Sequence, residues 1–167
     1  MTTEQPNGNG AACPPPSMSA EDFHELMDVL HLKSPCILLA EDDQSMRELL
    51  ASVFRAEGME VVEVADGGTL IRRMREARID ADPFHSPDII LADIWMPDAT
   101  GLDALMELRR TNALTPFILM TAFPSPETAE RARALGASAL FEKPFDIGDL
   151  RRAVQRFVRL RRSMFET

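Results

Sequence analysis

Short apolar runs alternate with segments of helical periodicity five times along this chain of 167 residues. Each run holds only four to six residues, the length of a buried strand and too short for a buried helix. The five predicted strands are Cys36–Ala40, Met59–Val64, Ile89–Ala92, Phe117–Met120 and Ala137–Phe141. Because a helical segment follows each run, we expect an α/β fold: a doubly wound, five-stranded parallel sheet with helices on both faces.

The segments between the runs place apolar residues every three or four positions, as amphipathic helices do. The clearest stripe is Met46, Leu49, Leu50, Val53 and Phe54. Gly58 follows this stripe and Gly136 follows a later one, as expected of residues just past helix ends. The last stripe, from Ile147 to Val158, predicts a helix after the fifth strand.

The composition limits the classes of function that the chain can have. Hydrophobic residues make up 45% and charged residues 27%, which is typical of an ordinary soluble globular domain. The formal net charge of −9 argues against a general electrostatic hold on nucleic acid or anionic membrane. No apolar run approaches the ~20 residues of a membrane span, and no secretory signal opens the chain. Cys13 and Cys36 lack metal-ligand spacing, and we expect a reducing, cytoplasmic location.

The chain divides into a polar start and one domain. Residues 1–34 form an N-terminal extension, of which the first twenty are too polar to form a core and are expected to be disordered. A short amphipathic helix is predicted near 21–31, either resting on the domain surface or docking a partner. The domain itself is expected over 35–162, followed by a tail at 163–167.

Polar residues stand at the carboxyl ends of four predicted strands. They are Glu41, Asp42, Asp93, Thr121 and Lys143. Ligands of an open parallel sheet bind outside these ends, so the side chains are expected to converge on one crevice. Each residue alone has an ordinary explanation as a helix cap or surface charge, but crowded carboxylates favour a hard divalent cation such as Mg²⁺. An opposing hydroxyl and ammonium fit the oxygens of a phosphoryl group, so this chemistry predicts an aspartate that accepts phosphate.

Four pieces of the sequence carry a resemblance to a known family. They are ILLAEDDQSMRELL, DIILADIWMPDATGLD, FILMTAF and FEKPFD. In this order and spacing they resemble the receiver domain of response regulators in two-component signalling, over about residues 35–160. The resemblance implies the flavodoxin-like (βα)5 fold, with Asp93 as the phosphoacceptor.

The resemblance also implies a metal site. Glu41 and Asp42 match the acidic pair that places Mg²⁺ in the family. Asp93 and the backbone carbonyl of Trp95 would complete the protein ligands. Glu41 stands where many members of the family have aspartate, and its longer arm is expected to reach the metal through water.

The remaining matched residues would act on the phosphoryl group. Thr121 would bind one of its oxygens and Lys143 another, with Pro144 following a cis peptide bond. Phosphorylation would draw Thr121 toward Asp93 and move the loop after the fourth strand. The expected output surface is built from the fourth helix, the fifth strand and the fifth helix.

The expected function is a stand-alone phosphorylation switch. A sensor histidine kinase or phosphotransfer protein would donate the phosphoryl group, and the product would change protein–protein contacts in a phosphorelay. The chain would not be an enzyme, although it would assist its own phosphorylation and dephosphorylation, and no direct DNA or membrane binding is expected. The alternative is a pseudo-receiver adapter that is never phosphorylated, against which the complete set of site residues counts. A phosphatase of the haloacid dehalogenase type is excluded, because Trp95 stands where its general acid would be.

Three further positions bear on how the switch works. Asp43, the third acid of its run, is expected to face solvent at a helix start rather than to bind metal. Leu140 stands where the family often has the aromatic residue that rotates on activation, and the chain has no tyrosine. Phe141 is adjacent, but strand alternation is expected to point it to the opposite face.

Two other features each allow two interpretations. Trp95 and Phe123 lie two residues beyond Asp93 and Thr121, so they either slow hydrolysis of the acyl phosphate or belong to an interaction surface. Six arginines lie between Arg151 and Arg162. They are either solvated charges suited to a helix C-terminus or a docking face for an acidic partner.

Overall fold

The computed structural model describes residues 18–19, 21–22, 26, 34–79, 86–111 and 113–164. The chain forms two compact units, Met1–Lys33 and Ser34–Thr167, and the sheet lies in the second. In the first unit, the Asp22 amide donates to Ser19 Oγ over 3.0 Å, the type of hydrogen bond that caps the start of a helix. Three predicted segments lie mostly outside the described residues: the disordered first twenty residues, the helix near 21–31 and the tail at 163–167.

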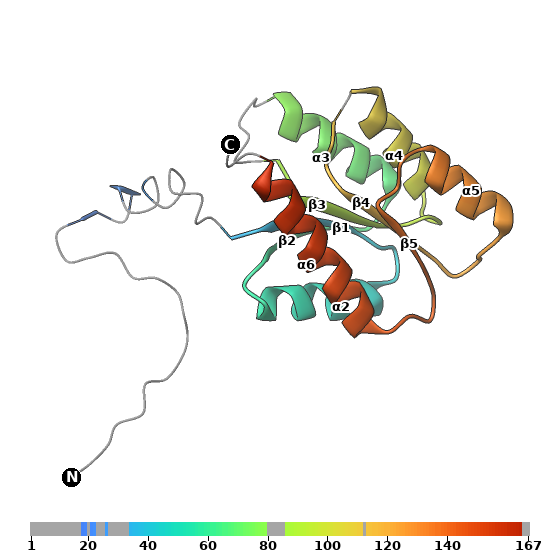
Figure 1. Ribbon diagram of the computed structural model, residues 1–167, viewed down its shortest axis with the longest axis horizontal. Helices are drawn as coiled ribbons and strands as arrows, with labels where there is room; N and C mark the ends of the chain where they lie inside the picture. Colours follow the sequence, from blue (N-terminus) through green and yellow to red (C-terminus); the bar gives the residue numbers. More distant parts are fainter. Residues whose placement is uncertain are drawn as a thin grey trace, which may run out of the picture. The chain divides into compact units, whose positions relative to one another are not determined.

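Five parallel strands form one sheet with the order β2-β1-β3-β4-β5 (Figure 1). The strands are β1 Cys36–Ala40, β2 Glu60–Val64, β3 Ile89–Asp93, β4 Phe117–Thr121 and β5 Ala139–Glu142. This confirms the predicted doubly wound α/β fold. Strands β3 and β4 are one residue longer than predicted, so Asp93 and Thr121 are themselves the last residues of their strands.

Two strands begin later than the apolar runs suggested, and both differences have the same cause. Met59 donates its amide to Phe54 O over 3.1 Å, and Ala137 donates to Ala132 O over 2.9 Å. In each case the preceding residue is a glycine with a positive φ, 81° at Gly58 and 78° at Gly136. These are the bonds of a Schellman helix ending, so Met59 and Ala137 belong to helix termini rather than to strands.

Five helices of the second unit cover the two faces of the sheet (Figure 1). Helices α2 Gln44–Ala56 and α6 Ile147–Ser163 pack on one face. Helices α3 Gly67–Ile79, α4 Gly101–Arg110 and α5 Pro126–Ala134 pack on the other. The longest, α6, has 17 residues and several arginines, and none of the described helices is long and apolar enough to cross a membrane.

Strand residues alternate between two apolar cores, one on each face of the sheet. Ile37 points to the core of α2 and α6, and its neighbour Leu38 to the core of α3, α4 and α5. Strands β3 and β4 are buried along their whole length, as expected of central parallel strands. Leu140 and Phe141 of β5 pack on opposite faces, as predicted from alternation.

Candidate functional site

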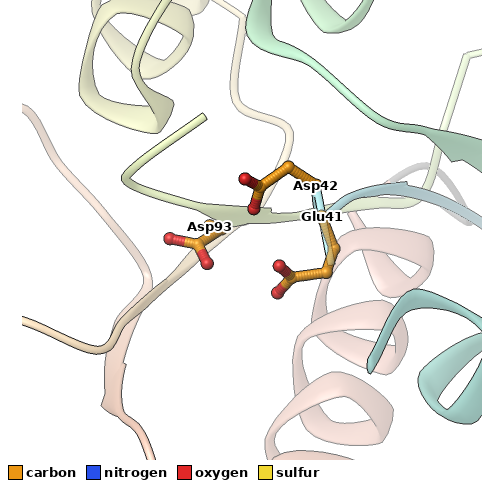
Figure 2. Close-up of side chains that lie close together, drawn as sticks. All are labelled: Glu41, Asp42 and Asp93. Atoms are coloured by element: carbon orange, nitrogen blue, oxygen red, sulfur yellow. The ribbon is translucent and has the colours of Figure 1, made fainter. Parts of the chain in front are cut away.

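Three carboxylates meet at the carboxyl edge of the sheet. Glu41 and Asp42 directly follow β1, and Asp93 ends the adjacent strand β3. One oxygen of each lies within 4.8 Å of the others, and Figure 2 shows the three groups around a common space. Glu41 is fully buried, Asp93 is 6% exposed and Asp42 is open to solvent. The predicted convergence of the acids is therefore present.

Lys143 reaches this cluster from the end of the edge strand β5. It follows β5, and its Nζ donates to Glu41 Oε2 over 2.7 Å and to Asp93 Oδ2 over 2.5 Å. Its backbone amide donates to Thr121 O over 2.7 Å, which ties the lysine to the end of β4. The peptide bond between Lys143 and Pro144 is cis, as predicted.

The charges of this cluster depend on one another. Burial raises the pKa of Glu41 and the negative charge of Asp93 acts in the same sense, while the hydrogen bond from Lys143 opposes both. Burial also disfavours the ammonium of Lys143, but its hydrogen bonds to Asp93 and Glu41 outweigh this and raise its pKa. Lys143 therefore stays charged and compensates part of the buried negative charge.

Two exposed aromatic residues follow closely on Asp93 and Thr121. The Trp95 amide donates to Asp93 Oδ1 over 2.9 Å, and the Phe123 amide donates to Thr121 Oγ1 over 3.1 Å. The two residues are 51% and 70% exposed, whereas Thr121 is fully buried. The backbone of each aromatic residue thus orients a site side chain, while its ring faces solvent at the site.

Asp43 is not part of the acidic cluster. Its Oδ1 accepts a hydrogen bond from the Met46 amide over 2.7 Å, so it caps α2, and it is exposed. This confirms that it faces solvent at a helix start. Its own amide donates to Glu41 Oε1 over 3.2 Å, which occupies the second carboxylate oxygen of Glu41.

Two glycines allow the loop after Asp93 to pack closely, and sequence reasoning did not identify them. A Cβ on Gly101 would lie 2.5 Å from the backbone oxygen of Asp93, and one on Gly67 would lie 1.9 Å from Ala99 O. Both glycines are the first residues of helices, where this residue type has little local advantage. That unusual placement is the signal that could have pointed to them.

Arg47 is a second contributor that the sequence did not reveal. Its Nη1 donates to the backbone oxygen of Glu41 over 2.7 Å, and its Nε lies 3.8 Å from Glu63 Oε1. It thereby ties the turn after β1 to α2 and β2. A single arginine on an amphipathic helix carries no spacing that distinguishes it from a surface charge.

The residues present fit a divalent cation of the Mg²⁺ type. Three carboxylates share one ammonium, so the cluster holds more acidic than basic groups. Hard oxygen donors suit Mg²⁺, which keeps several of its waters when it binds. Asp42 is exposed and offers a route for a hydrated ion, whereas both oxygens of Glu41 accept hydrogen bonds from the protein.

The fold, the strand-end carboxylates and the bridging lysine together define a receiver domain. The chain matches the response regulator receiver domain over residues 37–155, and it belongs to this family. It is 35% identical over 119 residues to the transcriptional regulatory protein PdtaR of Mycobacterium tuberculosis, covering 71% of this chain. It is 30% identical over 125 residues to sporulation initiation phosphotransferase F of Bacillus subtilis, covering 75% of this chain.

The extent of these matches differs between the two relatives. The chain spans about half of PdtaR, 54% of its length, but 94% of phosphotransferase F. Among solved structures, the chemotaxis protein CheY4 of Vibrio cholerae is 28% identical with a TM-score of 0.64, covering 75% of this chain and 99% of that one. The receiver domain of Francisella response regulator 1452 is 26% identical with a TM-score of 0.65, covering 75% and 98%.

Proposed function

We propose that this chain is a phosphorylation switch that accepts a phosphoryl group on Asp93 in a Mg²⁺-dependent reaction. The observation that carries the proposal is the position of the Asp93 carboxylate. One of its oxygens is bonded to Lys143 and the other to the Trp95 amide, within 4.8 Å of two further carboxylates. A carboxylate held in this way is oriented for attack, and its neighbours suit the charge of a transferring phosphoryl group.

In the proposed reaction, an oxygen of Asp93 attacks the phosphorus of a phosphohistidine on the donor protein. The new O–P bond forms as the P–N bond breaks, and the histidine nitrogen keeps the electron pair. The Lys143 ammonium, now bonded to Asp93, would pair with a phosphoryl oxygen, and the Thr121 hydroxyl would bind another. The product is an acyl phosphate on Asp93, so the chain acts as a stoichiometric phosphoacceptor rather than as an enzyme.

Asp42, Asp93 and the backbone carbonyl of Trp95 would hold the metal, with Glu41 contributing through water. When bound, Mg²⁺ would neutralise charge on the transferring oxygens. The protein groups supply the rest: Lys143 compensates the buried acids, and the Arg47 bond to Glu41 O holds the turn that carries Asp42.

The donor is proposed to be a sensor histidine kinase or a phosphotransfer protein, and a cytoplasmic location follows from this role. Phosphorylation would change the interaction of Thr121 with its surroundings and shift the loop between β4 and α5. A downstream protein would read the change, with α5, β5 and α6 as its surface. Leu140 is half-buried in β5 where the family often has an aromatic residue, so the movement of Thr121 would carry the switch.

Intact-mass measurement after incubation with acetyl phosphate and Mg²⁺ tests the proposal. The full chain should gain one phosphoryl group that is stable in acid and labile in base, and chelation of Mg²⁺ should abolish the gain. Asp93→Asn should show none. Asp98→Asn, in the exposed part of the same loop, should label as the wild type does.

Two outcomes would contradict the proposal. Equal labelling of Asp93→Asn and the wild type would show that another residue accepts the phosphoryl group. No labelling of a folded wild-type chain, with either acetyl phosphate or phosphoramidate, would favour the pseudo-receiver adapter instead.

A further inference from the structure

A pocket of about 450 Å³ lies at the end of the sheet opposite Asp93, and its size is within the range of small-molecule sites. Its walls come from α3, from the ends of α4 and α6, and from the segments that lead into β3 and β4. Ile90, near the start of β3, lies in its lining, whereas Asp93 ends the same strand. The pocket is therefore separate from the acidic cluster.

Most of the pocket lining is apolar. Met74, Ile90 and Leu108 are buried residues of the core that includes α3 and α4. Leu114 and Met164 also line the pocket but are 81% and 64% exposed, which places large apolar side chains in water. Covering such side chains is favourable by ~25 cal/mol for each Å² removed from water, so an apolar occupant would be stabilised here.

One positive charge interrupts this apolar surface. Arg161 is the one charged residue among the described residues that line the pocket, and it is half-buried. Its Nη1 donates to Thr115 Oγ1 over 2.6 Å, which fixes the guanidinium against the wall. Burial lowers the pKa of Arg161, opposed by the negative charge of Asp88, because the guanidinium is incompletely solvated. An anion placed beside such a cation gains a charge-assisted hydrogen bond in a poorly hydrated setting.

We propose that this pocket binds a small amphipathic carboxylate, with its apolar body against Leu108 and Leu114 and its carboxylate at Arg161. The apolar lining selects the body of the ligand, and the single guanidinium selects the sign of its head group. Binding is non-covalent, and it does not require that Asp93 accept a phosphoryl group.

Three probes that share one apolar body separate these two contributions. Octanoate, octanol and octylammonium differ in head-group charge but not in chain length. In titrations of the full chain followed by NMR, octanoate should shift the methyl signals of Leu114 and Met164 and leave the Trp95 indole signal unchanged. It should bind about tenfold more tightly than octanol, as a charge-assisted hydrogen bond would give, and octylammonium should bind most weakly.

Matched variants test the named residues. Arg161→Gln should reduce octanoate affinity to that of octanol, while Arg159→Gln, an exposed arginine of the same helix, should leave it unchanged. Ala77→Phe should fill the pocket and weaken all three probes, with thermal unfolding showing that the variant is folded. Equal affinity for octanoate and octanol in the wild type, or octanoate shifts at Trp95 instead of Leu114, would overturn the proposal.

Discussion

Lys143 compensates two buried carboxylates at once, because its Nζ lies 2.7 Å from Glu41 Oε2 and 2.5 Å from Asp93 Oδ2. All three side chains are largely withdrawn from solvent, with 16%, 1% and 8% of their surfaces exposed. A buried acid that loses its partner is costly, since neither water nor protein then stabilises its charge. The lysine proposed to hold the phosphoryl group therefore also holds the resting site together.

Replacement of Lys143 tests this dual role. Without Mg²⁺, Lys143→Met should lower the free energy of unfolding by about 2–4 kcal/mol, because Glu41 and Asp93 would face each other without a cation. Mg²⁺ should recover a larger part of the stability in the variant than it adds to the wild type, since it binds the folded state alone. Urea denaturation with and without Mg²⁺ measures both effects. Equal stabilisation of the two proteins by Mg²⁺ would contradict this explanation.

A second prediction at the residue scale concerns Trp95 and Phe123, which are expected to slow hydrolysis of the proposed acyl phosphate on Asp93. Both residues are exposed next to Asp93 and Thr121, and their rings offer no hydrogen-bond acceptor that could take a proton from an attacking water. Trp95→Asn combined with Phe123→Glu should therefore shorten the lifetime about tenfold or more, as a positioned general base or polar guide would. The decay of the labelled mass after removal of acetyl phosphate gives the rate. An unchanged lifetime would leave the aromatic pair as an interaction surface.

Each helix that follows a site strand begins with a polar cap. Asp43, Thr100, Ser125 and Asp146 each accept a hydrogen bond from a backbone amide three residues later, at the starts of α2, α4, α5 and α6. These caps satisfy amides that the first turn of a helix leaves without partners. Each cap also marks the residue at which the loop after a strand ends and the next helix begins.

The capping box of α4 gives this element a pH dependence. Hydrogen bonds from the Thr100 amide and hydroxyl lower the pKa of Asp103 below its ordinary value. A carboxylate with a depressed folded pKa adds stability above the unfolded pKa, and this stability is lost as pH falls through the folded value. Asp103→Asn should thus lower stability by about 1 kcal/mol at neutral pH. The difference in free energy of unfolding between the wild type and the variant, measured by urea denaturation, should decrease below about pH 4. A difference that does not change with pH would contradict this role of Asp103.

The end of α6 is fixed to the sheet through Asp88. Its carboxylate accepts from the Cys36 amide over 2.9 Å and pairs with Arg162 at 3.3 Å. Arg162→Ala removes only the ion pair and should lower the free energy of unfolding by about 0.5–1 kcal/mol. Asp88→Ala also leaves the Cys36 amide without this acceptor and should cost about 1–2 kcal/mol. Urea denaturation measures both free energies of unfolding. Equal decreases in the two variants would show that the hydrogen bond from the Cys36 amide to Asp88 contributes nothing to stability.

At the scale of the whole molecule, the net charge of −9 conceals a positive last helix. Several of its arginines have partners within the domain: Arg151 pairs with Glu57, Arg152 with Asp149 and Arg162 with Asp88. These three arginines thus have acidic partners within the domain. Arg156 and Arg159 are exposed on the same helix, and docking of an acidic partner there stays a prediction.

Most of the fold was predictable because alternation of apolar and amphipathic segments is a local property of the sequence. The site was predictable for the same reason: the carboxyl ends of parallel strands share one edge, so Asp42, Asp93 and Lys143 had to be neighbours. The first residues of β2 and β5 were not predictable in this way. Met59 and Ala137 are apolar, as strand residues are, but the hydrogen bond of each backbone amide makes it part of a helix ending.

Other features depend on distances that no local pattern encodes. The hydrogen bond from Lys143 to Glu41 spans 102 residues of sequence, and it depends on the path of β5 to the site. The contact of Gly67 with Ala99 depends on how two loops meet. The pocket beside Arg161 arises from segments that are far apart in the chain.

Chemical localisation of the phosphoryl group tests whether Asp93 is the residue that accepts it. After labelling with acetyl phosphate and Mg²⁺, borohydride reduction converts an aspartyl phosphate to homoserine, which tandem mass spectrometry places in the sequence. We expect homoserine at position 93 in the wild type, and none when Mg²⁺ is chelated. Homoserine at position 42 or 98 instead, or none at 93 in a chain that gained the phosphoryl mass, would contradict it.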